Sequence, residues 1–119
     1  SLIELRLQAN SFVGTLPTEI TACTSLKKLV AGKNFLTGTL PVGLGQLTTL
    51  DFLYVGENSL IGTVPTEFGQ LTALELVGIN NNFLTGILPT ELGKITKLQE
   101  FNAANNSLSG NLPTELGQW

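Results

Sequence analysis

Residues 26–49 read LKKLVAGKNFLTGTLPVGLGQLTT, and residues 50–73, LDFLYVGENSLIGTVPTEFGQLTA, repeat the same pattern. Leucine, asparagine, glycine and proline recur every 24 residues along the whole chain, without an insertion. The four columns are Leu2, Leu26, Leu50, Leu74 and Leu98; Asn10, Asn34, Asn58, Asn82 and Asn106; Gly14, Gly38, Gly62, Gly86 and Gly110; and Pro17, Pro41, Pro65, Pro89 and Pro113. Such a period is typical of a solenoid, in which each repeat forms one coil and stacks on its neighbours. We therefore predict a single domain over residues 1–119, with five 24-residue repeats that start at residues 2, 26, 50, 74 and 98.

Each repeat opens with the pattern LxxLxL, which favours a short strand with one buried face. The inward pairs are Leu5/Leu7, Leu29/Ala31, Leu53/Val55, Val77/Ile79 and Phe101/Ala103. Further apolar columns follow the asparagine and flank the proline, so each coil contributes about seven apolar side chains to one continuous core. The asparagine amide both donates and accepts, and it can therefore satisfy backbone groups where the chain leaves the strand.

The composition excludes several classes of function. Only 13% of the residues are charged and the net charge is −3, which gives no electrostatic reason to expect nucleic acid or an anionic membrane as a partner. No apolar run approaches the roughly 20 residues that a membrane-spanning helix needs. The chain has no histidine, and its single cysteine, Cys23, lies in a column of core residues.

No catalytic constellation stands out in the sequence, and we predict a protein that is not an enzyme and has no cofactor. One column carries a carboxylate in four coils: Glu19, Glu67, Glu91 and Glu115. A hard cation requires six to eight oxygens that converge on one point. Since this column offers one acid per coil, we interpret it as a solvated face and expect no metal site.

The second half of each repeat, NxLxGxLPxxLGxL, resembles the plant-specific class of leucine-rich repeats. Examples are NFLTGTLPVGLGQL from Asn34 and NNFLTGILPTELGKI from Asn81. This class occurs in the ectodomains of plant receptor kinases and receptor-like proteins, in plant inhibitors of cell-wall-degrading enzymes, and in algal proteins. The resemblance covers the whole chain. It implies an α/β solenoid, a right-handed superhelix with a parallel sheet on its concave side and a second short strand after the asparagine.

The resemblance also implies capping segments with paired cysteines, which this sequence lacks at both ends. A solenoid needs covered ends to remain soluble. We therefore expect the chain to be an excerpt of a longer array, with flanking repeats, caps or partner subunits at both ends. The resemblance further implies an extracellular or membrane-anchored ectodomain; a subunit of a lumenal or organellar complex is the alternative.

The outward strand positions form columns across the predicted concave face, and they change chemistry from coil to coil while the inward positions do not. Aromatic and apolar residues gather in the middle, and aromatic residues commonly anchor interfaces. We predict a contact surface for an unidentified protein, peptide or glycan partner, made of Arg6, Lys28, Val30, Phe52, Tyr54, Leu76, Asn80, Glu100 and Asn102. Phe35 and Phe83, just after the asparagine, are expected to pack partly along the edge of the coil.

Three functions remain open from the sequence. The leading hypothesis is a non-catalytic recognition module that binds through the concave sheet. The second is a structural subunit of a larger complex whose partners cover the ends of the solenoid. The third is binding to ice or another surface through threonine columns such as Thr15, Thr39 and Thr63. Asn105 begins the only N-x-[ST] sequence in the chain and is a possible glycosylation site.

Overall fold

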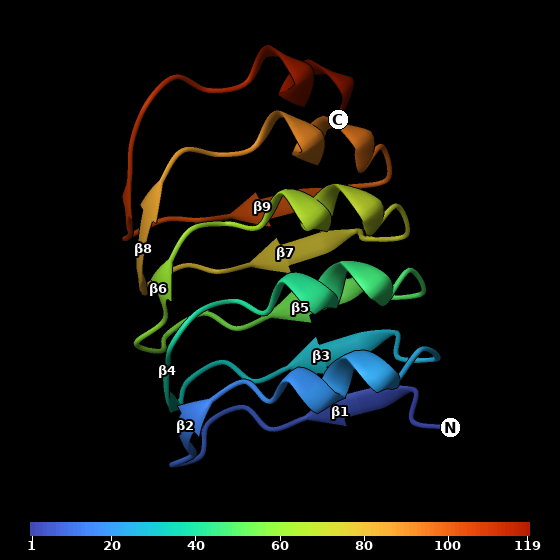
Figure 1. Cartoon of the computed structure of the whole chain (residues 1–119), viewed down its shortest axis with the longest axis vertical. Coiled ribbons are helices and arrows are strands. Elements are labelled where there is room, and N and C mark those ends of the chain that lie inside the picture. Colours follow the sequence, from blue (N-terminus) through green and yellow to red (C-terminus); the bar gives the residue numbers. More distant parts are fainter.

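The computed structural model describes residues 1–119 as a stack of coils, with the two termini at opposite ends of the stack (Figure 1). One strand from each coil joins a parallel five-stranded sheet in the order β1-β3-β5-β7-β9. These strands are β1 (Glu4–Arg6), β3 (Lys28–Val30), β5 (Phe52–Tyr54), β7 (Leu76–Gly78) and β9 (Glu100–Asn102). Equivalent residues of neighbouring coils are directly paired, for example Leu29 with Leu53. The predicted solenoid and its strand columns are confirmed.

A second short strand follows the asparagine in every coil, as the resemblance implies. These strands are β2 (Val13–Thr15), β4 (Phe35–Thr37), β6 (Ile61–Gly62), β8 (Phe83–Gly86) and β10 (Ser107–Leu108). They form two separate parallel ladders, β2-β4 and β6-β8-β10, which a single bridge between Thr39 and Ile61 connects. The glycine of this segment has a positive φ in every coil, from +76° to +83°, which other residues adopt only with strain.

The helical part of each coil is a five-residue 3-10 helix directly after the proline. The helices are η1 (Thr18–Ala22), η2 (Val42–Gln46), η3 (Thr66–Gln70), η4 (Thr90–Lys94) and η5 (Thr114–Gln118). The α part of the predicted α/β solenoid is thus made of 3-10 turns. The spacing explains this result: apolar residues three apart, such as Leu44 and Leu47, share one side of a helix with three residues per turn.

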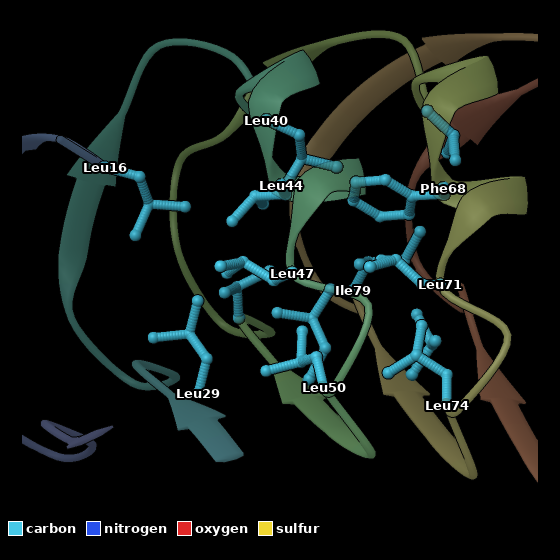
Figure 2. Packing of buried hydrophobic residues seen from close by; sticks show 14 of the residues in the cluster. Leu16, Leu29, Leu40, Leu44, Leu47, Leu50, Phe68, Leu71, Leu74 and Ile79 are labelled. Carbon is cyan, nitrogen blue, oxygen red and sulfur yellow. The ribbon is translucent and has the colours of Figure 1, made fainter. Parts of the chain in front are cut away.

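The core runs through the stack as one cluster of 23 buried residues. Leu44 and Leu47 from the second coil pack beside Phe68 and Leu71 from the third (Figure 2). The inward columns are less covered in the first and last coils, where Phe12 is 47% exposed and Leu112 is 76% exposed. This follows from the nearest-neighbour packing of a solenoid, because an end coil has a neighbour on one side only.

The asparagine column satisfies backbone groups beside the strand, as predicted, and it also connects neighbouring coils. The Asn58 amide donates to the carbonyl oxygens of Val55 and Gly56 in its own coil and of Ala31 in the preceding coil, at 3.1–3.3 Å. Its Oδ1 accepts the backbone N–H of Leu36 at 3.0 Å. The buried asparagines of this column, Asn34, Asn58 and Asn82, thereby satisfy backbone groups that the turn would otherwise leave unpaired in the core.

Candidate functional site

The exposed side of the five-stranded sheet, here called the sheet face, brings the predicted contact residues together. The register aligns Lys28, Phe52, Leu76 and Glu100 in one row across β3, β5, β7 and β9. A second row contains Arg6, Val30, Tyr54, Gly78 and Asn102. Because the strands are parallel and in register, side chains from coils 24 residues apart become neighbours.

Phe52 and Leu76 form the apolar floor of a shallow hollow of about 460 Å³ on the sheet face. Both side chains are half-buried. Three acidic residues, Asp51, Glu75 and Glu100, line the same hollow, together with Lys28 and Gln99. None of these three carboxylates lies within ion-pairing distance of a cation, since the ion pairs of the chain involve other acids.

The basic end of the sheet face is partly neutralised. The Nε of Arg6 lies 3.1 Å from Glu4 Oε2, and the Nζ of Lys28 lies 3.7 Å from Glu4 Oε1. Lys28 therefore borders the hollow, but its charged end is drawn toward the first coil. The sheet face changes from basic to acidic along the stack.

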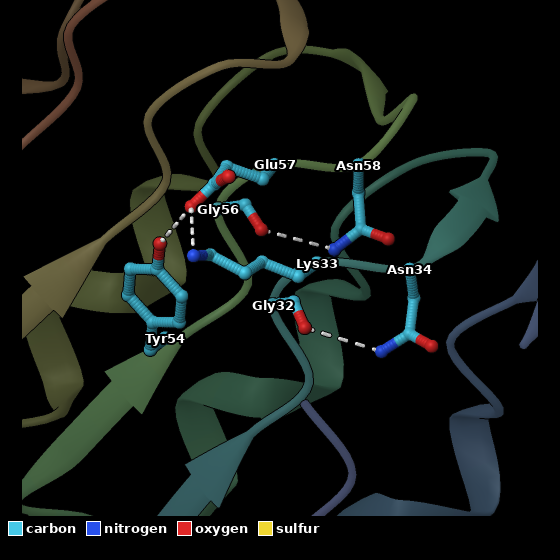
Figure 3. Close-up of polar contacts among 7 residues, drawn as sticks. All are labelled: Gly32, Lys33, Asn34, Tyr54, Gly56, Glu57 and Asn58. Atoms are coloured by element: carbon cyan, nitrogen blue, oxygen red, sulfur yellow. Dashed lines mark hydrogen bonds and ion pairs between the residues drawn. The ribbon is translucent and has the colours of Figure 1, made fainter. Parts of the chain in front are cut away.

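Tyr54 lies across the sheet face and contacts both neighbouring coils. A Cβ added to Gly32 or to Gly78 would overlap its ring, so these two glycines make room for it. Its hydroxyl donates to Glu57 Oε1 at 3.0 Å, and Lys33 Nζ lies 3.8 Å from the same oxygen (Figure 3). Burial raises the pKa of Tyr54 above its ordinary value of 10.0, and the hydrogen bond to Glu57 raises it further.

Two residues of the predicted contact surface are buried. Val30 is 7% exposed, because it is paired between Arg6 and Tyr54 and the tyrosine ring lies over this part of the sheet. Asn80 is 8% exposed, since its amide lies against the backbone of Gly56. The prediction that Val30 and Asn80 belong to the contact surface is therefore corrected, because a ligand cannot reach buried side chains directly. The Oδ1 of Asn80 has no hydrogen-bond donor within the chain.

A left-handed backbone position just before the asparagine was not recognised from the sequence. Its φ lies between 53° and 56° in every coil, at Ala9, Lys33, Glu57, Asn81 and Asn105. Asparagine tolerates this conformation better than most residues do, and two of the five positions carry it, which was the available signal. Asn105, the candidate glycosylation residue, is exposed and donates its amide to Asn81 Oδ1 at 2.8 Å.

The face formed by the second strands is uncharged and partly apolar. Phe35 and Phe83 are 62% and 61% exposed, so only the smaller part of each side chain is covered. Each phenylalanine lies between an asparagine of the repeat column and an inward leucine. Successive side chains of a strand point to opposite faces, so the phenylalanine points away from the core. Thr15, Thr39 and Thr63 are exposed on this side as well.

The threonines that begin the 3-10 helices carry hydrogen bonds of their own. In four coils this hydroxyl donates to the carboxylate of the following glutamate, at 3.2–3.4 Å, for example from Thr66 to Glu67. The carboxylate column therefore lies beside hydroxyl donors.

No group of three or more His, Cys, Asp or Glu residues in the chain is arranged to hold a metal ion. None of its helices is long and apolar enough to cross a bilayer.

Comparisons with known proteins agree with this architecture. The family model described as Leucine Rich Repeat matches residues 97–119. No curated protein sequence matches the chain significantly.

Among solved structures, the plant peptide hormone receptor RGFR1 in complex with RGF2 is 32% identical over 98% of this chain and 19% of its own, with a TM-score of 0.97. The Arabidopsis receptor kinase HAESA, in complex with the peptide hormone IDA and the co-receptor SERK1, is 35% identical over 98% of this chain and 20% of its own, with a TM-score of 0.95. A chain of the BIR3–SERK2 complex from Arabidopsis thaliana is 31% identical over 98% of this chain and 63% of its own length, with a TM-score of 0.92. The chain thus spans about a fifth of the two receptors and less than two thirds of the third protein.

Proposed function

Because the chain is an array of plant-type leucine-rich repeats, we propose that it is a non-catalytic recognition module that binds an extended peptide or protein segment across the sheet face. The observation that carries the proposal is the hollow over Phe52 and Leu76. It combines an apolar floor with polar walls, which is the arrangement that orients a bound ligand.

Two further observations support this function. Several structural neighbours are receptor ectodomains that are described in complex with peptide hormones. The sheet is also closely packed at this site, since its strands pair in register and its inward residues, such as Leu53 and Val77, are fully buried. A rigid surface limits the entropy that is lost when a ligand binds.

The proposal is tested by selecting displayed random peptides of about 12 residues against the immobilised chain. An extended peptide advances about 3.3 Å per residue, so this length exceeds the roughly 19 Å between the first and last of five strands. The selected peptides are then measured against the double variant Phe52→Ala, Leu76→Ala. We expect this variant to keep its circular dichroism spectrum and to bind the peptides at least about tenfold more weakly, since apolar residues in a binding hollow carry much of the affinity.

The matched control is the double variant Phe35→Ala, Phe83→Ala, which removes two exposed apolar side chains from the second-strand face. We expect unchanged affinity. Loss of binding in the control together with retention in the sheet-face variant would move the recognition surface to the second strands and refute the proposal.

The proposed location is the extracellular side of a membrane, as for the receptor ectodomains that the chain resembles. Asn105 gives a direct readout, because a glycan on an N-x-[ST] asparagine requires passage through the secretory route. Glycan mass on the peptide that contains Asn105, from the native protein, would support this location.

A further inference from the structure

We infer that the hollow on the sheet face receives a basic side chain, lysine or arginine, of the bound peptide. This inference rests on the proposed function, since it names the residue type that a bound peptide would place there. Its basis is the combination of the apolar floor of Phe52 and Leu76 with the unpaired carboxylates of Asp51, Glu75 and Glu100.

The floor fits the long stem of a basic side chain. Lysine and arginine bury their methylene groups along apolar surfaces while the charged end stays among polar groups. Phe52 and Leu76 are paired side by side on β5 and β7, and both remain half-exposed. The Phe52 ring can in addition attract a cation that lies over its face. A purely apolar side chain would use only the apolar floor, and an acidic side chain would be repelled by the acidic residues of the hollow.

The walls supply the charge complement. Asp51 and Glu75 directly precede β5 and β7, and Glu100 begins β9, so the three carboxylates come from three successive coils. All three line the hollow, and none is engaged by a cation of this chain. Lys28 is the one cationic residue that lines the hollow, and its Nζ lies 3.7 Å from Glu4 Oε1 in the preceding coil, so the acidic residues of the hollow outnumber it three to one. The local field in the hollow therefore favours a positive ligand group.

The positive charges of the second coil determine in which direction the peptide lies across the sheet face. Lys27, Lys28 and Lys33 all belong to the second coil, whereas the carboxylates of the hollow belong to the third, fourth and fifth coils. A peptide with its basic residue in the hollow and an acidic residue toward the second coil would match both regions. The opposite orientation would place like charges together, which costs binding energy.

The experiment uses the displayed 12-residue peptides that bind the full chain. We expect the selected sequences to be enriched in lysine or arginine next to an apolar residue. The triple variant Asp51→Asn, Glu75→Gln, Glu100→Gln is expected to bind these peptides about tenfold more weakly, as the sum of three modest ion-pair contributions. Replacing the basic residue of a selected peptide by glutamine should have a similar effect on the unmodified chain, and none on the triple variant.

The control is the triple variant Glu67→Gln, Glu91→Gln, Glu115→Gln, which removes the same number of charges from the 3-10 side of the coils. It should bind the selected peptides as the unmodified chain does. Peptides that are lost by the Phe52→Ala, Leu76→Ala variant but lack basic residues and tolerate the acidic triple variant would overturn this inference and leave the proposed function standing. Peptides that tolerate both sheet-face variants, or a selection that yields no binders, would overturn both.

Discussion

Asn80 and Asn82 lie two residues apart and are both buried, but only the side-chain oxygen of Asn82 accepts a hydrogen bond. The Asn82 amide donates to the carbonyl oxygens of Val55, Ile79 and Asn80, and its Oδ1 accepts from Leu60 N–H. The Asn80 Oδ1 has no donor. An unpaired buried acceptor costs free energy, whereas a satisfied amide stabilises the groups that it joins.

We therefore expect different changes in the free energy of unfolding when each of these two asparagines is replaced by alanine. Asn82→Ala leaves several backbone groups unpaired in the core and should lower the free energy of unfolding by about 2–4 kcal/mol. Asn80→Ala removes the unpaired acceptor, and it should change the free energy of unfolding by less than about 1 kcal/mol or raise it. Urea denaturation of both variants measures the two values. Equal losses would show that Asn80 is as well bonded as the ladder asparagines.

The raised pKa of Tyr54 predicts that the free energy of unfolding depends on pH in the alkaline range. Burial and the neighbouring Glu57 raise its pKa in the folded chain above 10.0, so the folded state keeps the phenol proton longer than the unfolded state does. The corresponding stability is fully present below the unfolded pKa, near 10, and is lost as the pH rises through the folded pKa. Tyr54→Phe should remove this part of the dependence in thermal melts between neutral and strongly alkaline pH. Since Tyr54 is the only tyrosine, its tyrosinate absorbance reports the titration directly; a midpoint at or below 10.0 would contradict the account.

At the scale of elements, the stacking of the 3-10 helices depends on glycine. A Cβ on Gly69 would lie 2.5 Å from the backbone oxygen of Glu91 in the next coil, and Gly45 and Gly93 have the same relation to their neighbours. The fifth coil offers a control within the same motif, because nothing lies within 4 Å of a Cβ on Gly117. Close packing of the coils, and not the backbone conformation, therefore requires this glycine.

Gly69→Ala should lower the free energy of unfolding by about 1–3 kcal/mol, the usual cost of overpacking a closely packed contact. Gly117→Ala should be neutral or slightly stabilising, since alanine reduces the entropy of the unfolded chain where it meets no clash. Thermal melts of the two variants make the comparison. If both were equally tolerated, the coils would have to be able to move apart at η3 and η4.

The sequence was sufficient for the features that repeat and insufficient for those that depend on one side chain. The strand columns and the asparagine ladder were predictable because the same spacing occurs in five coils. The burial of Val30 and Asn80 was not, because it depends on the direction of the Tyr54 ring and on the glycines beneath it. The extent to which Phe35 and Phe83 are exposed was not predictable from their apolar residue type, because the strand geometry directs these side chains outward.

At the scale of the whole molecule, the solenoid separates its faces by chemistry. The sheet face carries the charge gradient and the hollow. The second strands carry an uncharged face with exposed phenylalanines, and the 3-10 side carries the glutamate column. A ligand that recognises charge and shape together fits the sheet face best. Which face is used is therefore the central question about function.

The most direct test is nuclear magnetic resonance mapping of the backbone amides during titration with a selected peptide. We predict that the largest shift changes gather in β3, β5, β7 and β9, around Phe52, Leu76 and Glu100, and that the 3-10 helices change little. Shift changes that gather instead around Phe35 and Phe83 on the second strands would contradict recognition through the sheet face.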